Sequence, residues 1–392
     1  MTTLKTSVLG IDFENPFLLA SAPPTARIES IDKAFELGWG GAVLKTITPD
    51  GLEMIEASPR YAAWKVGTKI LGFENIEMLS HLTVKEWLDG IEYLKTKHPT
   101  KVIIASIMAP VVKEEWQKIV TTFNTSKADA FELNFSCPNG MPEKGIGMAI
   151  GTSPEISAMI TEWVKEVATK PVFVKLTPNV TDITEIAKAV LNKGADGLAA
   201  INTVQSLMGI DLDTFDPLPN IHNTSTFGGY SGAAVKPIGL RCVAQIRQTT
   251  DKPILGIGGI SNWHDAAEYI AIGADVVQIC TEVMVNGYGI ISSLKKGLLE
   301  YLESKNLTSP LELKNKALAK LTMHKTLNKA NQYYPQIDHA ACVKCQKCVT
   351  LCNESEHAAL SFKQERIELD KSKCVGCSLC SLVCSKSCIQ MK

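Results

Sequence analysis

The chain has 392 residues, which at roughly 150 residues per domain predicts two or three domains. Hydrophobic residues make up 45% of the chain and charged residues 21%, a globular composition that excludes disordered, collagen-like and coiled-coil proteins. No apolar run approaches the roughly 18 residues of a membrane-spanning helix, and no apolar leader follows the N-terminal residues. We therefore expect a soluble cytoplasmic protein that binds neither membranes nor nucleic acid.

The net charge of -1 is unevenly distributed. Residues 311–392 hold 13 lysines and arginines against 7 acidic residues, so this tail is basic and the preceding body is acidic. Nine of the twelve cysteines lie between positions 342 and 388. Twelve cysteines are too few for a disulfide scaffold in a chain of this length, so their crowding indicates a dedicated site in the tail.

From residue 12 to about residue 300, short apolar runs alternate with amphipathic, helix-like stretches. Eight of the runs are expected strands, at 16–22, 41–46, 101–107, 130–135, 171–176, 197–203, 253–258 and 276–281. This alternation is typical of parallel strands joined by crossover helices. We therefore predict an α/β fold, a TIM (β/α)8 barrel over residues 1–310.

Three of these strands begin alike, because the tripeptides at 127–129, 194–196 and 273–275 each end a helix and turn into a buried run. We interpret them as helix-to-strand turns at the bottom of the barrel. An open doubly wound sheet is the alternative, but no Gly-x-Gly-x-x-Gly fingerprint follows an early strand.

Residues 311–336 follow as a lysine-rich, helix-like connector. A solvated helix is the ordinary interpretation of such a segment, and a docking face for an acidic electron carrier or partner chain is the alternative. Residues 337–392 then form a separate ferredoxin-like domain.

One cysteine spacing occurs twice in this last domain. Cys342-x2-Cys345-x2-Cys348-x3-Cys352 is repeated as Cys374-x2-Cys377-x2-Cys380-x3-Cys384. Two-cluster bacterial ferredoxins have this arrangement, in which the fourth cysteine of each run binds the other cluster. We therefore predict two [4Fe-4S] clusters. The first has the ligands Cys342, Cys345, Cys348 and Cys384, and the second has the ligands Cys374, Cys377, Cys380 and Cys352.

The proline that usually follows the fourth cysteine is absent, since Asn353 and Ser385 stand there. Structural zinc is the alternative, but zinc sites usually pair two Cys-x2-Cys units roughly 10 to 20 residues apart. Cys388 has no place in either set and is expected to be a buried bystander. Because clusters transfer single electrons, the barrel is expected to hold a cofactor that accepts one electron at a time and delivers two, which points to a flavin.

Polar residues follow the expected strands at their C-terminal ends, where TIM barrels carry their chemistry. Two of them, Lys45 and Lys175, would be costly to bury unless they face an anion such as a reduced flavin. Glycines after the seventh strand, with Thr281 after the eighth, fit the usual phosphate site of such barrels. Each of these residues alone is more often structural than functional, so the prediction depends on the whole set of residues at the strand ends.

Motifs along the whole chain resemble one family. They are Ala20-Ser21-Ala22, Gly38-Trp39-Gly40-Gly41, Leu44-Lys45-Thr46, Ala105-Ser106-Ile107-Met108, Glu132-Leu133-Asn134-Phe135-Ser136-Cys137-Pro138, Lys175-Leu176-Thr177-Pro178-Asn179, Asn202-Thr203-Val204, Gly229-Tyr230-Ser231-Gly232 and Gly256-Ile257-Gly258-Gly259. On these motifs the chain resembles dihydropyrimidine dehydrogenases nearly end to end, in particular the bacterial flavin and iron–sulfur subunit, and over the barrel it is also similar to class 1 dihydroorotate dehydrogenases.

The resemblance implies FMN in the barrel and Cys137 as proton donor and acceptor. Reduction of an enone-like C5=C6 bond needs a hydride from flavin N5 and a proton from an acid on the opposite face, and a thiol with a free pKa of about 8.5 suits that role. The expected cofactor-binding residues are Ala20, Ser21, Lys45, Thr46, Lys175, Asn202, Gly232, Gly258, Gly259, Cys280 and Thr281. The resemblance also implies that Asn134, Asn202 and Thr203 hold the pyrimidine ring.

The chain departs from the dihydropyrimidine dehydrogenase pattern after Ala105-Ser106-Ile107-Met108, where an asparagine is expected and Ala109-Pro110-Val111-Val112 stands instead. Conversely, four asparagines resemble the substrate cradle of dihydroorotate dehydrogenases. They are Asn75, Asn134, Asn139 and Asn202. Both substrates therefore stay open, and all four asparagines are expected substrate residues.

We expect an oxidoreductase acting on CH–CH groups that interconverts uracil or thymine and the 5,6-dihydro forms. Dihydroorotate oxidation, or reduction of another ring, is the alternative within that class, and a zinc-bearing binding protein is the alternative from another class. Because no NAD(P) fingerprint is present, we expect a separate FAD/NAD(P)-binding subunit or a ferredoxin as electron partner, in a homo- or hetero-oligomer.

Overall fold

The computed structural model describes residues 2–52, 55–136, 147–330, 332–355 and 357–392. The chain folds into two compact units, Met1–Lys320 and Leu321–Lys392. Within the described residues, every helix is too short or too polar to cross a membrane.

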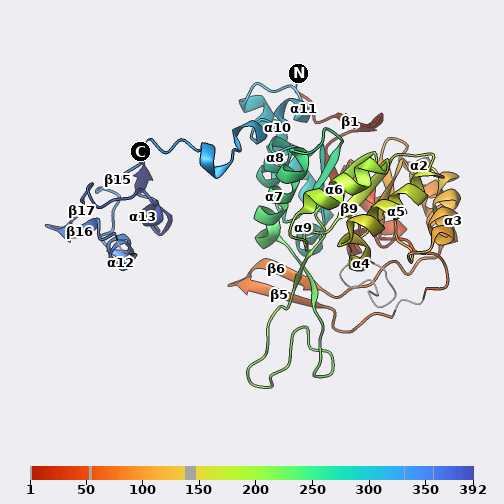
Figure 1. The fold of residues 1–392 in the computed structure, drawn as a ribbon, viewed down its shortest axis with the longest axis horizontal. Coiled ribbons are helices and arrows are strands. Elements are labelled where there is room, and N and C mark those ends of the chain that lie inside the picture. The colour runs from red at the N-terminus through yellow and green to blue at the C-terminus, as the bar shows by residue number, and fades with distance from the viewer. Residues whose placement is uncertain (1, 53–54, 137–146, 331, 356) are drawn as a thin grey trace. The chain divides into compact units, whose positions relative to one another are not determined.

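The first unit contains a closed barrel of eight parallel strands (Figure 1). The barrel closes where Val277 of the last strand pairs with Phe17 of the first. Each strand lies inside one of the eight ranges expected from the sequence, which confirms the predicted TIM barrel. The strands are β3 (Phe17–Leu19), β4 (Gly41–Val43), β7 (Val102–Ile107), β8 (Ala130–Asn134), β9 (Val172–Leu176), β10 (Gly197–Ala200), β13 (Ile254–Ile257) and β14 (Val276–Ile279).

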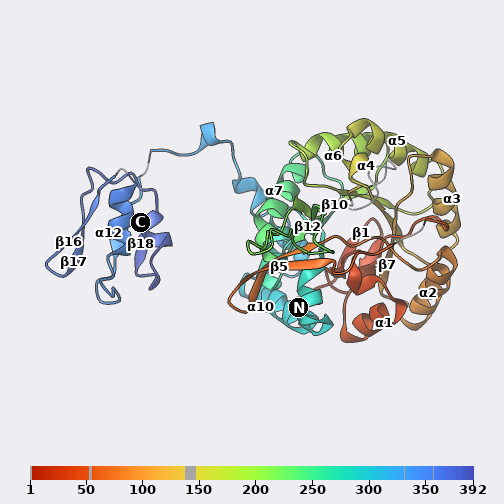
Figure 2. The same cartoon turned by 90° about the horizontal axis from the view of Figure 1, so that it is seen from below.

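Helices surround the strands, as Figure 2 shows. Their apolar residues recur every three or four positions, as Trp87, Ile91 and Leu94 do, so each helix buries one face against the barrel. Side-chain caps fix several helix starts, for example where Thr83 Oγ1 accepts from Glu86 N. The longer helices are α1 (Ile28–Leu37), α2 (Val84–Lys97), α3 (Lys113–Asn124), α5 (Pro154–Lys165), α6 (Ile183–Asn192), α7 (Lys236–Arg247), α8 (Trp263–Ala271) and α10 (Ile291–Ser304), and the short ones are α4 (Met148–Gly151) and α9 (Thr281–Asn286).

Alternate residues of each strand point into the barrel and stack in layers. The lower layer is apolar and includes Phe173 of β9 and Val276 of β14. Two residues further along the same strands stand Lys175 and Gln278, and Glu132 of β8 is buried beside them. The period of two therefore places a buried polar layer directly below the mouth of the barrel.

Two antiparallel elements were not expected from the sequence. The hairpin of β1 (Thr6–Val8) and β2 (Ile11–Phe13) packs apolar side chains against the lower layer of the barrel. A four-stranded sheet contributes residues to the mouth. It consists of β11 (Val204–Ser206), β12 (Gly228–Ser231), β6 (Lys69–Asn75) and β5 (Tyr61–Val66), in that order. These strands are short, half-exposed or glycine-containing, so they lack the apolar runs by which the barrel strands were recognised.

The segment 311–336, for which the sequence predicted a helix-like connector, is mostly irregular. It holds the end of one helical turn, α11 (Pro310–Leu313), and two 3-10 turns. Its first part belongs to the barrel unit, where Ala317 N donates to Ala271 O at the end of α8. From residue 321 to residue 330 every position is exposed, including Leu321, Met323 and Leu327, so no packing of an apolar face stabilises a helix here.

The second unit is built from two small antiparallel sheets and two helices. Strand β15 (Pro335–Ile337) pairs with β18 (Ile389–Met391), and β16 (Leu360–Lys363) pairs with β17 (Arg366–Leu369). The helices α12 (Lys347–Glu354) and α13 (Leu379–Leu382) pack against each other. The core is small and contains Val349, Leu360, Ile367 and Ile389 together with several cysteines.

Candidate functional site

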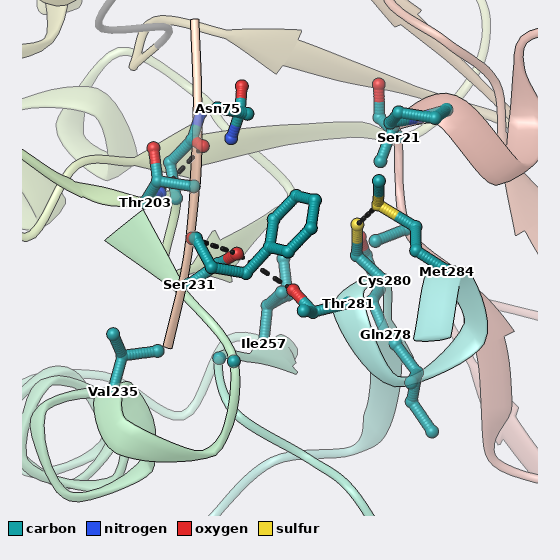
Figure 3. A pocket seen from close by; sticks show the side chains of 18 of the residues that line it. Ser21, Asn75, Thr203, Ser231, Val235, Ile257, Gln278, Cys280, Thr281 and Met284 are labelled. Atoms are coloured by element: carbon teal, nitrogen blue, oxygen red, sulfur yellow. Dashed lines mark hydrogen bonds between the residues drawn. The ribbon is translucent and has the colours of Figure 1, made fainter. Parts of the chain in front are cut away.

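A cavity opens at the carboxyl ends of the barrel strands (Figure 3). All eleven expected cofactor-binding residues line it, although they come from widely separated parts of the chain. Of the expected substrate residues, Asn75, Asn134, Asn202 and Thr203 also line it. The expected catalytic residue Cys137, and Asn139, lie outside the described residues.

A chain of hydrogen bonds crosses one wall of this cavity. Ser21 Oγ lies 3.1 Å from Thr46 Oγ1, and Asn134 Nδ2 donates to Thr46 Oγ1 at 2.8 Å. Asn202 Nδ2 donates to Asn134 Oδ1 at 3.3 Å and to Ser136 Oγ at 2.8 Å. The two asparagines are thus held in fixed orientations by each other and by residues at the ends of other barrel strands, as a rigid polar binding surface requires.

Both buried lysines of the cavity are paired with carboxylates. Lys45 Nζ lies 3.3 Å from Glu77 Oε1, and their side chains are only 9% and 10% exposed. Lys175 Nζ lies 3.4 Å from Glu132 Oε1, and Gln278 Nε2 donates to the other oxygen of Glu132 at 2.8 Å. The negative charge that the sequence analysis expected from a cofactor is therefore supplied in part by the chain itself.

Glu77 is also bound by a tyrosine of β5. Tyr61 Oη donates to Glu77 Oε2 at 3.0 Å, so both oxygens of this carboxylate are engaged. Burial raises the pKa of Tyr61 to about 12, which keeps its hydroxyl protonated and donating at neutral pH. The four-stranded sheet thereby fixes a carboxylate in the wall of the cavity.

Three glycines form a close-packed corner of the cavity. Gly232, Gly258 and Gly259 all have positive φ angles, of 91°, 124° and 70°. A Cβ atom on Gly259 would come within 2.6 Å of Lys236 N, so only glycine fits there. Beside them, Thr281 Oγ1 donates to Ser231 Oγ at 2.8 Å, which joins the end of β12 to the start of α9 (Figure 3).

Some polar atoms of the cavity have no partner within the described part of the chain. Thr203 Oγ1 and Gln278 Oε1 are buried and make no hydrogen bond there. Buried polar atoms are normally paired, so these two indicate that a polar ligand completes the site. Cys280 is different, because its thiol lies 3.7 Å from Met284 Sδ and desolvation raises its pKa to about 11.

The eight expected cluster ligands line two separate cavities in the second unit. The expected ligands that line one of them are Cys342, Cys345, Cys348 and Cys384. The other is lined by Cys352, Cys374, Cys377 and Cys380. The structure thus brings the fourth cysteine of each run to the cavity of the other run, as the ferredoxin spacing predicts.

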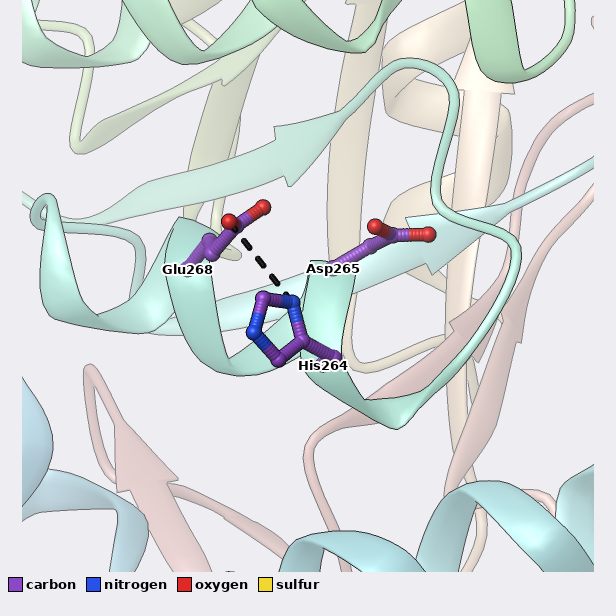
Figure 4. A group of neighbouring side chains, drawn as sticks. All are labelled: His264, Asp265 and Glu268. Carbon is purple, nitrogen blue, oxygen red and sulfur yellow. Dashed lines mark ion pairs between the residues drawn. The ribbon is translucent and has the colours of Figure 1, made fainter. Parts of the chain in front are cut away.

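A further group of possible metal ligands lies on α8 (Figure 4). Its carboxylates are already engaged, because Lys236 Nζ contacts Asp265 Oδ1 at 2.7 Å and Glu268 Oε2 at 2.8 Å. The second oxygen of Asp265 accepts from Ser261 N and Asn262 Nδ2 at the start of the helix. These contacts explain the group as a helix-capping network.

Comparison with known proteins agrees with this geometry. A family model described as dihydroorotate dehydrogenase matches residues 3–302, and a model described as a 4Fe-4S dicluster domain matches residues 335–391. This chain belongs to the dihydroorotate dehydrogenase family. It is an oxidoreductase of the type that acts on CH–CH groups, as predicted, and its family implies a flavin in the barrel and iron–sulfur clusters in the second unit.

Relatives within this dihydroorotate dehydrogenase family include enzymes of two kinds. The chain is 38% identical over 367 residues to the PreA subunit of NAD-dependent dihydropyrimidine dehydrogenase of Escherichia coli, which covers 92% of this chain and 88% of the relative. It is 38% identical to a chloroplastic dihydropyrimidine dehydrogenase (NADP(+)) of Arabidopsis thaliana, over 83% of this chain and 79% of the relative. It is 37% identical to the catalytic subunit of dihydroorotate dehydrogenase B (NAD(+)) of Pyrococcus abyssi, over 80% of this chain and 99% of the relative.

The residues present fit both a flavin and iron–sulfur clusters. The glycine corner has no Cβ atoms, so a bound group can approach its backbone closely, and the side-chain oxygens of Thr203 and Gln278 have no hydrogen-bond partner among the described residues. In the second unit, four cysteines per cavity form the donor set that iron–sulfur clusters require.

Sequence reasoning missed three residues that shape the site: Glu77, Tyr61 and Gln278. Glu77 and Tyr61 lie on or next to strands that were not predicted. Gln278 could have been found, because it follows the inward-pointing Val276 by two residues on a predicted strand.

Proposed function

We propose that this protein interconverts uracil or thymine and the 5,6-dihydro forms, using FMN in the barrel and two [4Fe-4S] clusters in the second unit. One observation supports this substrate over dihydroorotate. Among the described residues that line the cavity, the only lysines are Lys45 and Lys175, no arginine lines it, and both lysines are paired with carboxylates.

The substrates differ in charge. Orotate and dihydroorotate carry a carboxylate, which needs a cation to offset its desolvation, whereas uracil and thymine are neutral and present two N–H donors and two carbonyl acceptors. The cavity offers acceptors and donors in the carboxylate of Glu77 and the amides of Asn134 and Asn202. A fixed carboxylate beside the substrate therefore favours a neutral ring and disfavours an acid.

FMN would be held at the mouth by the expected set of residues. The glycine corner, with Thr281 and Ser231, would bind the phosphate through close-approaching backbone, and Lys45 and Lys175 would lie beside the isoalloxazine ring. When bound, the flavin supplies the hydride for C6 of the pyrimidine. Cys137 would supply the proton at C5, from a thiol that needs no neighbouring base.

Electrons would pass between the flavin and an outside partner through the clusters. The two matching family models are described as dihydroorotate dehydrogenase and 4Fe-4S dicluster domain, and the Escherichia coli relative is named as a subunit. We therefore propose a separate FAD/NAD(P)-binding subunit or a ferredoxin as the electron partner.

Dihydroorotate is the second candidate substrate. It is favoured by the asparagines of the cavity, Asn75, Asn134 and Asn202, and by the similarity to the catalytic subunit from Pyrococcus abyssi. The charge of the cavity argues against it, and the experiment below separates the two.

The test is titration of the oxidised flavoprotein with uracil and with orotate, followed by the change in flavin absorbance. We expect uracil to bind more tightly, and Glu77→Gln to weaken uracil binding about 10-fold to 100-fold, the value of one hydrogen bond to a charged group. Glu282→Gln is the matched control, because this carboxylate also lines the cavity but is bound to Asn286. Tighter binding of orotate than of uracil by the wild-type protein would reject the proposed substrate.

A further inference from the structure

The first cluster cavity contains a fifth thiol. Besides Cys342, Cys345, Cys348 and Cys384, the residues lining it include Cys388. The Sγ atoms of Cys384 and Cys388 are 3.4 Å apart, and Cys388 is only 6% exposed. The sequence analysis assigned this cysteine no role, but the structure places its sulfur among the expected ligands.

The position of Cys388 is fixed by the sheet that follows it. Its carbonyl oxygen accepts from Asp338 N at 2.8 Å, and the next residue, Ile389, pairs with Ile337 across β15 and β18. Ser381 Oγ donates to Ile389 O at 2.7 Å, which ties the strand to α13. The thiol is therefore held beside Cys384 by three hydrogen-bonded contacts of the backbone around it.

The sulfur separation allows either thiol to bind the same metal atom. Metal–thiolate bonds in tetrahedral protein sites are about 2.3 Å long. Two sulfurs that are 3.4 Å apart therefore share positions at which one iron atom lies within bonding distance of either sulfur. A small side-chain rotation, without movement of the strand, is enough to exchange one ligand for the other.

We propose that Cys388 is a reserve ligand of the first iron–sulfur cluster and replaces Cys384 when that residue no longer binds iron. In the exchange, the bond between iron and the Cys384 sulfur breaks, the Cys388 thiol loses its proton to solvent, and its sulfur bonds the same iron. The oxidation state of the cluster does not change. This inference rests on the two clusters proposed above.

The second cavity supplies an internal control. It is lined by Cys352, Cys374, Cys377 and Cys380, and no fifth cysteine lines it among the described residues. Cys352 occupies the same place in its run as Cys384 does in the other. Loss of Cys352 therefore leaves an iron without a replacement ligand, whereas loss of Cys384 does not.

The experiment compares three variants of the full chain, prepared without oxygen: Cys384→Ala, Cys384→Ala with Cys388→Ala, and Cys352→Ala. Iron per chain and the EPR spectrum of the oxidised protein are measured, because an oxidised three-iron cluster is paramagnetic and an oxidised [4Fe-4S] cluster is not. We expect Cys384→Ala to keep about eight iron atoms and remain EPR-silent. The double variant and Cys352→Ala should each lose at least one iron atom and give the three-iron signal or lose the cluster.

Wild-type protein with far fewer than about eight iron atoms would count against the proposed clusters themselves, independently of Cys388. With wild-type iron intact, equal iron loss in Cys384→Ala and in the double variant would overturn the reserve-ligand role. A second measurement avoids changing any of the eight expected ligands. On exposure of the holoprotein to air, Cys388→Ala should lose iron faster than wild type, and equal rates would also overturn the proposal.

Discussion

Lys175 is held inside the barrel by a carboxylate that has no exposure to solvent. The side chain of Glu132 is 0% exposed and that of Lys175 is 5% exposed, and Gln278 occupies the remaining oxygen of the carboxylate. Removing one member of such a buried pair costs about 3–5 kcal/mol, because the other charge is left uncompensated. Neither member of the ion pair can therefore be replaced alone without a large loss of stability. The pair fixes an ammonium group at the floor of the cavity.

Among single residues, the proposed acid Cys137 gives the clearest test by substitution. We expect Cys137→Ala to lower turnover of the pyrimidine about 10²-fold to 10⁴-fold, the range typical of general acid catalysis. Steady-state rates with the physiological electron donor, or with an artificial one, measure the effect.

Two controls accompany Cys137→Ala. Flavin and iron content should stay at wild-type levels, because this residue is assigned no role in holding either group. Cys242→Ala, which changes a fully buried cysteine of α7 outside the cavity, should keep turnover near that of wild type. Retention of more than about a tenth of the wild-type rate by Cys137→Ala would show that its thiol is not the acid.

The raised pKa of Cys280 predicts how the stability of the folded protein depends on pH. Burial raises the pKa of its thiol to about 11, against about 8.5 in an unfolded chain. Between these two values the folded protein keeps the thiol proton, whereas the unfolded chain releases it. The contribution of this thiol to the free energy of unfolding is therefore complete below about pH 8.5 and is lost as the pH rises towards 11. In thermal unfolding monitored by circular dichroism, the melting temperature of Cys280→Ala should fall less than that of wild type between these values. Parallel curves for the two proteins would contradict this account.

At the scale of elements, three aspartates join the helices to the barrel strands. Each of them accepts a hydrogen bond from a backbone N–H at the start of a neighbouring strand. The N···O distances are 2.8 Å for Asp129, 2.8 Å for Asp196 and 2.9 Å for Asp275. Each also pairs with a basic side chain, from Lys95, Lys165 and Arg247 respectively. This repeated contact explains why the three tripeptides of similar sequence lie at equivalent helix-to-strand turns.

The glycine corner gives a prediction at the same scale. Gly259→Ala places a methyl group within 2.6 Å of Lys236 N in a backbone conformation that alanine rarely adopts, so we expect the purified protein to lose most of its flavin. Gly287→Ala is the matched control, because Gly287 also has positive φ, at 77°, but a Cβ there meets nothing within 4 Å. Flavin content measured by absorbance after denaturation compares the two. Equal flavin content would exclude the corner as part of the binding site.

The barrel strands could be predicted because burial on both faces makes each one a continuous apolar run. The run that includes Val172–Leu176 shows this, since all five residues are buried. The strand Tyr61–Val66 could not be predicted in the same way, because half of its residues are exposed and it pairs with the next strand of a hairpin, β6, outside the barrel. The position of Glu77 depends on that pairing, so the carboxylate on which we base the proposed substrate was missed.

The cluster ligands could be predicted more completely than the cavity of the barrel. A spacing within one run fixes which cysteines are close, whereas the barrel site assembles residues from Ala20 to Met284 through the closure of the whole sheet. Cys388 is buried, as expected, but its place beside the first cluster cavity could not be predicted, because no spacing rule includes it and the pairing of β15 with β18 brings it there.

At the scale of the whole molecule, the two units divide the work of a redox enzyme. The barrel has a cavity with paired charges, where we propose the ring chemistry takes place, and in the second unit the eight expected ligands line two cavities. Because clusters transfer single electrons and the proposed reaction at the pyrimidine ring needs two, we propose that the flavin connects the two processes.

The most direct test of this account is anaerobic reoxidation of the reduced protein. The holoprotein is reduced with dithionite, freed of excess reductant and mixed with uracil, thymine or orotate in a stopped-flow spectrophotometer, without any partner subunit. We expect uracil or thymine to restore the oxidised flavin spectrum and to be converted to the dihydro form, while orotate leaves the flavin reduced. Reoxidation by orotate, with none by uracil or thymine, would contradict the account.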